Sequence, residues 1–267
     1  MPAPSSLRYP PMNSKTILSY NLLEGLQNSE LQMDVFVRWV QEIDPDIIFY
    51  QELNDLTEPT LRSMAERFGH PFAVRMKEPG YRVGISSKQE ITDIQRFADE
   101  TTLGYISARI GEYHVFAVHL DPFTDEARIQ EIKSILQRAD EIPPHENVII
   151  AGDFNSFSAL DRATYEVDPD GLMNSLPAVN PDWKLDFTVT NLMREAGFTD
   201  VYKQFNPEFQ HTWPTPKRLI PGDRNWRIDY IFVNDVLKEK CQGGEIVQDR
   251  ITKFLSDHYP LVVRLGD

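Results

Sequence analysis

The sequence predicts an α/β protein in which two packed mixed β-sheets are flanked by helices. Three observations predict this class. Short β-prone apolar runs recur along the chain, segments of helical periodicity lie between them, and several of the runs begin or end in Asp, Asn, Glu or His. Polar groups at strand ends are typical of α/β proteins, which bind ligands where their strands terminate.

The first elements form a β-α-β unit. A β-prone run over residues 16–20 ends at Asn21, and a strand over 46–51 follows Pro45. Between them, apolar residues recur at helical spacings of three and four: Met33, Phe36, Val40 and Ile43. A second helix is expected over residues 61–68, where Gly69 and Pro71 stop it.

The rest of the chain mixes short strands with helices. Strands are expected over 81–86, 90–96, 104–110 and 113–119, with a hairpin turn at Gly111-Glu112. An amphipathic helix over 129–139 leads into a strand that ends at Asp153. Residues 165–183 are expected to form a surface excursion, followed by a helix over 187–197 and by strands over 199–202, 228–233 and 261–265.

Composition indicates a soluble globular protein. The chain has 267 residues, of which 1–14 are expected to be a flexible tail and 15–267 a single catalytic domain. No run is apolar enough to cross a bilayer, and we expect a monomer. Cys241 is the only cysteine, so an internal disulfide is impossible. A chain with one cysteine is compatible with the cytoplasm, which we expect by default, and it is also compatible with export.

The net charge of −14 weighs against broad electrostatic binding to nucleic acid. A local patch can override that average. The candidate combines phosphate-binding charge with stacking surfaces in Lys217, Arg218, Arg224 and Arg227, interleaved with Trp213 and Trp226. We expect Arg224, Trp226 and Arg227 to bind substrate. The alternative is a solvated loop with the two tryptophans packed beneath it.

The strongest local signal is an apolar run that ends in Gly152-Asp153-Phe154-Asn155. In an extended chain, residues i and i+2 point the same way, so Asp153 and Asn155 are expected to face one oxyanion or metal. Other strand termini add similar groups: Asn21, Glu52, His119, Asp229, Asp257 and His258. Oxygen ligands with few nitrogens suit Mg²⁺, or Mn²⁺, better than zinc. The set also matches what phosphodiester hydrolysis requires.

In this order, the motifs resemble the endonuclease/exonuclease/phosphatase superfamily from Thr16 to Leu265. The most specific pieces are Gly152-Asp153-Phe154-Asn155, Arg227-Ile228-Asp229-Tyr230 and Ser256-Asp257-His258. The resemblance implies a deoxyribonuclease I-like four-layer α/β sandwich. It also implies a Mg²⁺-dependent phosphoester hydrolase with its site where the strand ends of the two sheets meet.

The resemblance also implies roles for individual residues. Glu52 looks like the principal metal ligand, assisted by Asn21 and Asp257. Asp153 would activate the attacking water, and Asn155 would bind water or a phosphate oxygen. His258 would lie beside the scissile phosphate with Asp229 orienting its ring, and His119 would be the second imidazole. Simpler readings stay open, because Asn21 could be a turn former and His119 a structural histidine.

The substrate is less defined than the chemistry. The residues around Trp226 are similar to those of apurinic endonucleases, but Val118-His119-Leu120 replaces the tyrosine-containing segment of that branch. A phosphodiesterase or a nuclease acting on nucleic acid is the interpretation that fits best. The alternatives are a phosphomonoesterase for a small or lipid-derived phosphate, and an inactive binding module on the same fold.

Overall fold

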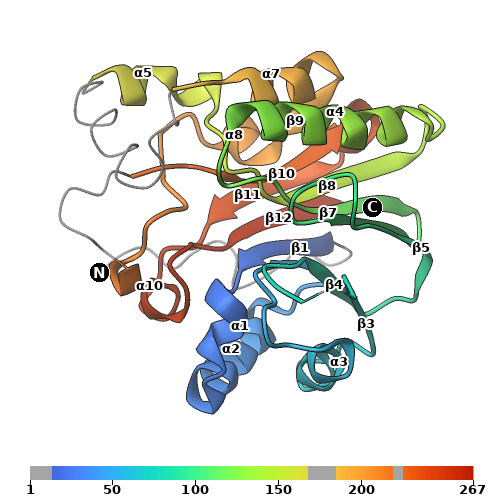
Figure 1. The fold of residues 1–267 in the computed structure, drawn as a ribbon, viewed down its shortest axis with the longest axis vertical. Helices are drawn as coiled ribbons and strands as arrows, with labels where there is room; N and C mark the ends of the chain where they lie inside the picture. Colours follow the sequence, from blue (N-terminus) through green and yellow to red (C-terminus); the bar gives the residue numbers. More distant parts are fainter. Residues whose placement is uncertain (1–13, 78, 168–184, 219–224, 267) are drawn as a thin grey trace.

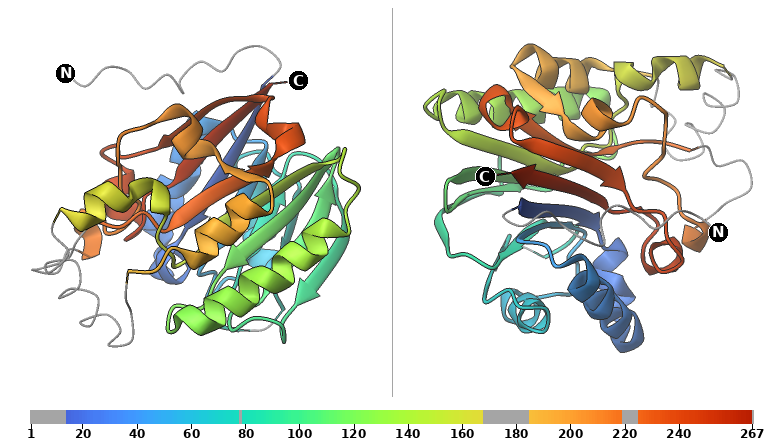
Figure 2. Two further views of the ribbon diagram at one scale, coloured as in Figure 1. Left: turned by 90° about the horizontal axis from the view of Figure 1, so that it is seen from above. Right: turned by 180° about the vertical axis from the view of Figure 1, so that it is seen from behind.

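The protein folds as a sandwich of two β-sheets between two layers of helices. We describe a computed structural model that covers residues 14–77, 79–167, 185–218 and 225–266. Figure 1 shows the layers stacked from bottom to top, with α2 and α3 below the first sheet and α4 and α7 above the second. Figure 2 shows the same stacking from two other directions. The predicted fold class is confirmed.

The first sheet has the strand order β11-β12-β1-β2-β4-β3. Its strands are β1 (Ser14–Asn21), β2 (Ile47–Gln51), β3 (Phe72–Arg75), β4 (Gly84–Ser87), β11 (Cys241–Ile246) and β12 (Leu261–Gly266). The second sheet has the order β5-β6-β7-β8-β10-β9. Its strands are β5 (Ile91–Phe97), β6 (Tyr105–Ile110), β7 (Tyr113–His119), β8 (Asn147–Asp153), β9 (Phe198–Asp200) and β10 (Asp229–Asn234).

Each sheet contains one parallel pair, and its other pairs are antiparallel. β1 is parallel to β2, and β7 is parallel to β8. Both parallel pairs are joined by a helical crossover, as parallel strands require. The crossover helices are α2 (Glu30–Ile43), which follows the short α1 (Leu23–Gln27), and α4 (Asp125–Asp140). As a result, β1 and β2 end at one edge of the first sheet, and β7 and β8 end at one edge of the second.

The remaining helices complete the outer layers and the loops. They are α3 (Glu58–Glu66), α5 (Arg162–Glu166), α7 (Thr188–Glu195), α8 (Val201–Phe205), α9 (Asp235–Lys238) and α10 (Thr252–Leu255), with 3₁₀ turns η2 (Ala159–Asp161) and η3 (Pro216–Arg218). Side-chain oxygens cap the first turns of the crossover helices: Ser29 accepts from the Gln32 N–H, and Thr124 accepts from the Ala127 N–H. Among the described helices, none has both the length and the apolar character needed to cross a membrane.

The core between the sheets is a set of period-two apolar stripes. On β7, Val115 and Ala117 face the other sheet, and on β8, Ile149 and Ala151 do the same. Ile17 of β1 faces them from the first sheet. The alternate residues of these strands pack against the helices instead, as Val118, Val148 and Ile150 do beneath α4 and α7. Therefore the residue that continues each stripe at the strand end also points between the sheets.

The structure corrects some of the predicted elements. Residues 199–202 are not one strand, because β9 stops at Asp200, whose carboxylate caps α8 by accepting from the Lys203 N–H. β3 and β11 were not predicted individually. β3 is short, and β11 contains Gly243 and Gly244, which have low β-propensity. The predicted tail over 1–14 lies outside the described residues except for Ser14, which already belongs to β1.

One buried histidine outside the strand-end groups helps to hold the first sheet. The His70 ring lies 2.8 Å from Ser86 Oγ through Nδ1 and 2.7 Å from the Pro45 carbonyl through Nε2. Burial, only partly offset by these hydrogen bonds, lowers the pKa of His70 to about 4. The unfolded chain, with an ordinary histidine pKa near 6.5, therefore binds this proton first as pH falls.

This predicts a pH-dependent loss of stability. Between about pH 6.5 and 4 the His70 contribution should lower the free energy of unfolding with a slope of up to about 1.4 kcal/mol per pH unit. Urea unfolding across this range should show a shallower pH slope for His70→Gln than for the parent. Equal slopes in the two proteins would contradict the assignment, whatever their absolute stabilities.

Candidate active site

The candidate site is centred on the end of β8. In the register of the second sheet, Asp153 pairs with His119 of β7 on one side and with Asp229 of β10 on the other. All three continue the apolar stripes that face the first sheet. Side chains of directly paired residues lie on the same face and close together. The strand register alone therefore gathers an imidazole and two carboxylates, and they are almost fully buried.

Two imidazoles converge on one oxygen of Asp153. His119 Nε2 and His258 Nε2 each lie 3.7 Å from Asp153 Oδ2. Asn21 Nδ2, from the first sheet, donates to the same oxygen at 3.2 Å. Burial, together with the nearby Asp229 charge, raises the pKa of Asp153 to about 6, although the two imidazoles oppose that shift. Asp153 is thus a stronger base than an ordinary aspartate.

His258 is oriented by Asp229. Its Nδ1 lies 2.9 Å from Asp229 Oδ2, which leaves Nε2 directed toward Asp153. Burial disfavours the charged ring, but the carboxylates of Asp229 and Asp153 outweigh it and hold the pKa of His258 well above its usual range. We infer a protonated imidazolium that partly neutralises the buried acids. His119 is fixed differently, with Nδ1 3.3 Å from the Tyr81 carbonyl oxygen.

Glu52 reaches the site through an unusual backbone conformation. Gln51 pairs with Asn21 in the register of β1 and β2, so strand alternation would turn Glu52 to the opposite face. Instead Glu52 has a φ of +57°, in the left-handed region. Its Oε1 accepts from Asn21 Nδ2 at 3.0 Å, and its Oε2 accepts from the Glu24 N–H at 3.1 Å. The two predicted metal-binding side chains are therefore in contact.

Asn155 lies in the site for a reason other than the predicted one. β8 ends at Asp153, and Asn155 has a φ of +45°, so the two residues do not share one face of an extended strand. The Asn155 N–H donates to Asp153 Oδ1 at 2.9 Å, which closes a tight turn. Its Nδ2 donates to the Leu120 carbonyl, next to His119.

Asp257 has one carboxylate oxygen held and one without a partner. Oδ2 accepts from Trp213 Nε1 at 3.3 Å and from Arg218 Nη1 at 3.1 Å. Oδ1 is buried and has no hydrogen-bond partner among the described residues. An unpaired buried carboxylate oxygen is costly unless a cation or a donor meets it. This oxygen and the oxygen-rich donor set of Asn21 and Glu52 fit a hard divalent cation.

A second buried group of possible ligands consists of Asp153, Asp229 and His258, whose ligand atoms lie within 4.8 Å of one another. In this group the His258 Nδ1 already contacts Asp229, and its Nε2 is directed toward Asp153. The two groups therefore differ in chemistry: Asp257, Asn21 and Glu52 suit the cation, whereas the Asp153 group suits proton transfer.

The structure corrects the expected substrate-binding residues. Trp226 is 2% exposed and Arg227 is 0% exposed, so neither lines an open surface. Trp226 stacks on Trp213 with ring centroids 4.5 Å apart. The Arg227 guanidinium binds Asp161 and Asp200 at 2.6 and 2.7 Å. Arg224, like most of the predicted excursion over 165–183, lies outside the described residues.

Several contacts that shape the site were not predicted from the sequence. The Tyr81 carbonyl that fixes His119 could belong to any residue type, so no pattern identifies it. The contacts of Trp213 and Arg218 with Asp257 cross more than thirty residues of chain. Their only sequence signal is the polar and aromatic composition of the segment before Asp229.

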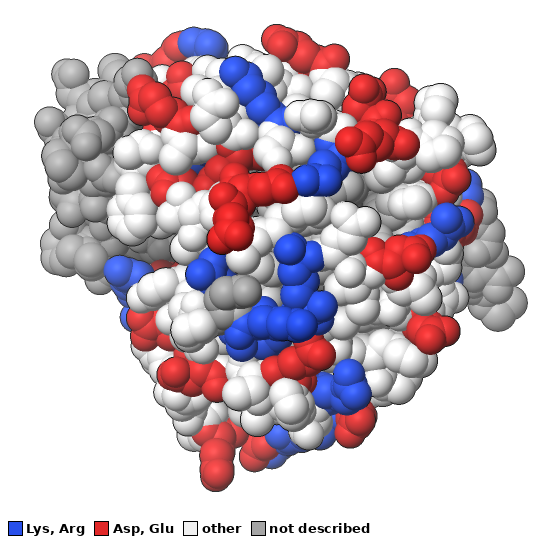
Figure 3. All heavy atoms as spheres, turned by 45° about the vertical axis from the view of Figure 1, so that its right-hand side comes forward, with Lys and Arg blue, Asp and Glu red and all other residues white. Residues whose placement is uncertain are grey.

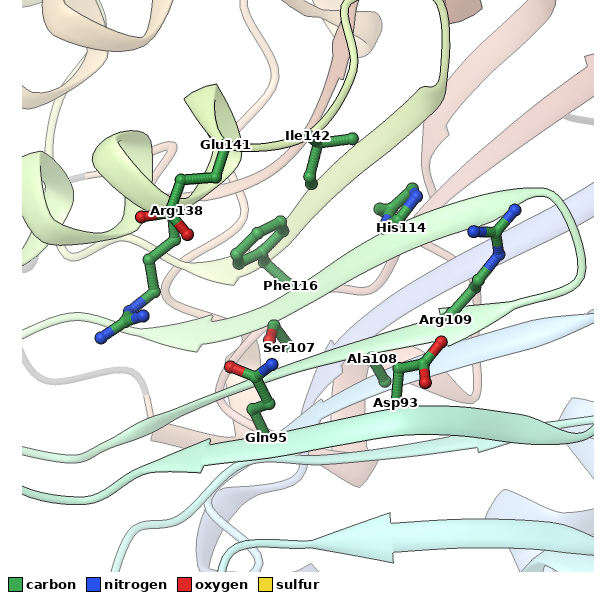
Figure 4. A pocket seen from close by; sticks show the side chains of 10 residues that line it. All are labelled: Asp93, Gln95, Ser107, Ala108, Arg109, His114, Phe116, Arg138, Glu141 and Ile142. Atoms are coloured by element: carbon green, nitrogen blue, oxygen red, sulfur yellow. The ribbon is translucent and has the colours of Figure 1, made fainter.

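The described residues also line a cavity away from the candidate active site. This cavity, of about 290 Å³, lies on the outer face of the second sheet beside the end of α4 (Figure 4). Phe116 forms part of its floor, with Arg109, His114 and Arg138 around it. His114 contacts Glu146 and Arg138 contacts Glu100, so these side chains already have partners.

Comparison with known proteins identifies the fold and the family of this chain. The two packed six-stranded sheets flanked by helices form a deoxyribonuclease I-like α/β sandwich. A family model described as "Endonuclease/Exonuclease/phosphatase family" matches residues 18–258, so the chain belongs to this family. The family is divalent-metal dependent, and the site contains a buried cluster of acids and an imidazole. A search of curated proteins finds no match.

Solved structures share the fold at low sequence identity. An AP endonuclease from Archaeoglobus fulgidus is 20% identical with a TM-score of 0.71, over 93% of this chain and 98% of that one. TDP2 from D. rerio, complexed with a single-strand DNA product, is 18% identical with a TM-score of 0.68, over 95% and 99%. The 3' phosphatase NExo from Neisseria, bound to a product DNA hairpin, is 16% identical with a TM-score of 0.66, over 95% and 100%. At these identities the likeness establishes the fold.

The close approach of β7 and β8 predicts an intolerant position at Gly152. Its φ is +150°, and a Cβ there would lie 1.9 Å from the Val118 carbonyl oxygen. Gly152→Ala should therefore force the strands apart, lower the free energy of unfolding by about 1–3 kcal/mol and disturb the pairing of His119 with Asp153. Urea unfolding measures the first effect. Gly243→Ala is the matched control, because nothing lies within 4 Å of its Cβ position; equal losses in both variants would refute the steric argument.

Proposed function

We propose that this chain is a divalent-metal-dependent phosphodiesterase that cleaves nucleic acid by attack of water. The observation that carries the proposal is the convergence of His119 Nε2 and His258 Nε2 on Asp153 Oδ2, each at 3.7 Å. These distances are beyond hydrogen bonding and leave the three groups directed at a common point. A water and a phosphate oxygen bound there would meet the Asp153 carboxylate and the Nε2 atoms of two imidazoles.

The raised pKa values of Asp153 and His258 support different roles for these two residues. Asp153, with its raised pKa, accepts a proton from the attacking water. His258, kept protonated by Asp229, donates to a phosphate oxygen and stabilises the charge that develops there. His119 lies on the other side of Asp153, with its Nδ1 against the Tyr81 carbonyl oxygen and its Nε2 toward Asp153. Asn155 closes the turn that holds Asp153 through its backbone N–H, and its side-chain amide donates to the Leu120 carbonyl.

The cation would be held by Glu52, Asn21 and the unpaired oxygen of Asp257. When bound, Mg²⁺ or Mn²⁺ supplies Lewis-acid stabilisation of the phosphoryl oxygens. Asn21 links the two halves of the site, since its Nδ2 contacts both Glu52 Oε1 and Asp153 Oδ2. These contacts support one centre in which proton transfer and charge neutralisation occur together.

Nucleic acid as the substrate class is supported by the relatives and by local charge. The TDP2 and NExo structures are described with DNA product bound. The net charge of this chain is −14, but charge is not uniform over its surface. Figure 3 shows Lys and Arg side chains gathered near the middle of one face, with Asp and Glu side chains around them. Local basic areas of this kind can bind phosphates despite an acidic average.

A substrate and metal panel tests the proposal. The purified chain is incubated with bis(p-nitrophenyl) phosphate, p-nitrophenyl phosphate, single-stranded DNA, duplex DNA and RNA. We expect diester cleavage with Mg²⁺ or Mn²⁺, its loss in EDTA and its return on adding back the metal. Preferential release of orthophosphate from the monoester would favour a phosphomonoesterase, and absence of turnover on every substrate would favour a binding module.

Asp153→Ala should reduce the diester cleavage rate by about 10²–10⁴-fold, because the variant lacks the base that takes the proton from water. The circular dichroism spectrum should stay unchanged. Asp34→Ala, which removes a carboxylate from the exposed Asp34–Arg67 ion pair, is the control and should keep full activity. Substantial residual turnover by Asp153→Ala would remove Asp153 from its proposed role.

A further inference from the structure

The basic residues that precede β10 differ in how much of their charge is still exposed. Arg227 is buried between Asp161 and Asp200. The Lys217 ammonium donates to Gln32 Oε1 at 2.6 Å and to the Leu255 carbonyl at 2.8 Å, so it fastens η3 to α2 and α10. Arg218 differs from both, because 57% of its side chain is exposed to solvent.

Arg218 reaches from solvent to a buried carboxylate of the site. Its Nη1 lies 3.1 Å from Asp257 Oδ2, and the Asp257 side chain is only 3% exposed. Among the described residues, Asp257 is the ion-pair partner of the Arg218 guanidinium. A guanidinium has five N–H donors in a planar fork, so its contact with Asp257 leaves donors that the described residues do not occupy.

The backbone around Arg218 is tied to the catalytic segment. The Arg218 N–H donates to the Thr215 carbonyl at 3.2 Å, and the Thr215 N–H donates to the Asp257 carbonyl at 2.9 Å. Thr215 Oγ1 also donates to the Ser256 carbonyl at 2.5 Å. These bonds fix η3 to the strand-end residues 256–258. The position of the guanidinium relative to His258 is therefore set by main-chain contacts as well as by its ion pair.

We infer that Arg218 binds a non-scissile phosphate of the nucleic acid, adjacent to the one that is cleaved. The inference rests on the proposed function and deepens it, because it makes a substrate with at least two phosphates the preferred one. Arginine is well suited to this role, since its fork matches phosphate oxygens and stays charged at all relevant pH values.

The geometry favours a neighbouring phosphate over the scissile one. Arg218 approaches Asp257 at Oδ2, whereas the oxygen with no partner, Oδ1, is the one available to the cation. The cation and the two imidazoles serve the reacting phosphate, so Arg218 lies to one side of that group. Trp213 Nε1 holds the same Oδ2 at 3.3 Å, so Asp257 keeps one restraint when Arg218 turns to a substrate.

The test compares two diesters that differ in the number of phosphates. Values of kcat/KM are measured with Mg²⁺ for a ten-nucleotide single-stranded DNA and for bis(p-nitrophenyl) phosphate, which has one phosphate. For Arg218→Ala, the ratio of the two kcat/KM values should fall about tenfold, mainly through a higher KM for the DNA. Arg218→Lys should recover part of the ratio. Arg67→Ala, which removes an exposed arginine of the Asp34 ion pair, should leave it unchanged.

A binding measurement gives a second readout that does not depend on turnover. In an Asp153→Ala background, fluorescence anisotropy of the labelled ten-nucleotide DNA is followed against salt concentration. Loss of one phosphate contact should reduce the slope of log affinity against log salt by about 0.7. Unchanged slope and ratio would overturn the inference, and so would equal losses on both diesters, which would mean that Arg218 acts only through Asp257. If the parent cleaves neither diester, the proposed function fails, and the salt slope still decides whether Arg218 contacts a phosphate.

Discussion

The site depends on the contact between the two sheets at the ends of their strands. Asn21 of β1 donates to Asp153 of β8 across that contact, and the apolar stripes behind them fix the distance between the sheets. Each stripe has an ionisable or amide group as its last member, as His119 follows Val115 and Ala117. The packing that folds the protein and the geometry that serves its chemistry are therefore set by the same alternation of side chains.

Burying so many acids at one place has an electrostatic cost that the structure offsets locally. Asp153, Asp229 and Asp257 are each 2–3% exposed. The raised pKa values of Asp153 and His258 are two results of this crowding, one acid becoming more basic and one imidazole becoming a stable cation. The remaining unpaired oxygen, on Asp257, explains why a bound cation would stabilise the fold as well as the reaction.

Much of this could be predicted from the sequence, because strand ends with polar residues are visible as breaks in apolar runs. The fold class and the crossover units belong to such patterns, whereas the pairing of His258 with Asp229 was implied by the resemblance to the family. The left-handed conformation of Glu52 could not be predicted, since no glycine marks it. Asparagine tolerates the left-handed region, so the turn at Asn155 had a local signal that the extended-strand interpretation missed. The burial of Arg227 depends on Asp161 and Asp200, which are 66 and 27 residues away in sequence.

The left-handed residues have a consequence for engineering. Glu52 holds a left-handed backbone angle, which costs an ordinary L-residue about 1–2 kcal/mol, whereas asparagine at position 155 adopts that region more readily. Selection for heat tolerance alone would thus favour glycine at position 52, where the side chain is not part of the hydrophobic core. The selected variant would be more stable, but it would lack the carboxylate that contacts Asn21 in the candidate site.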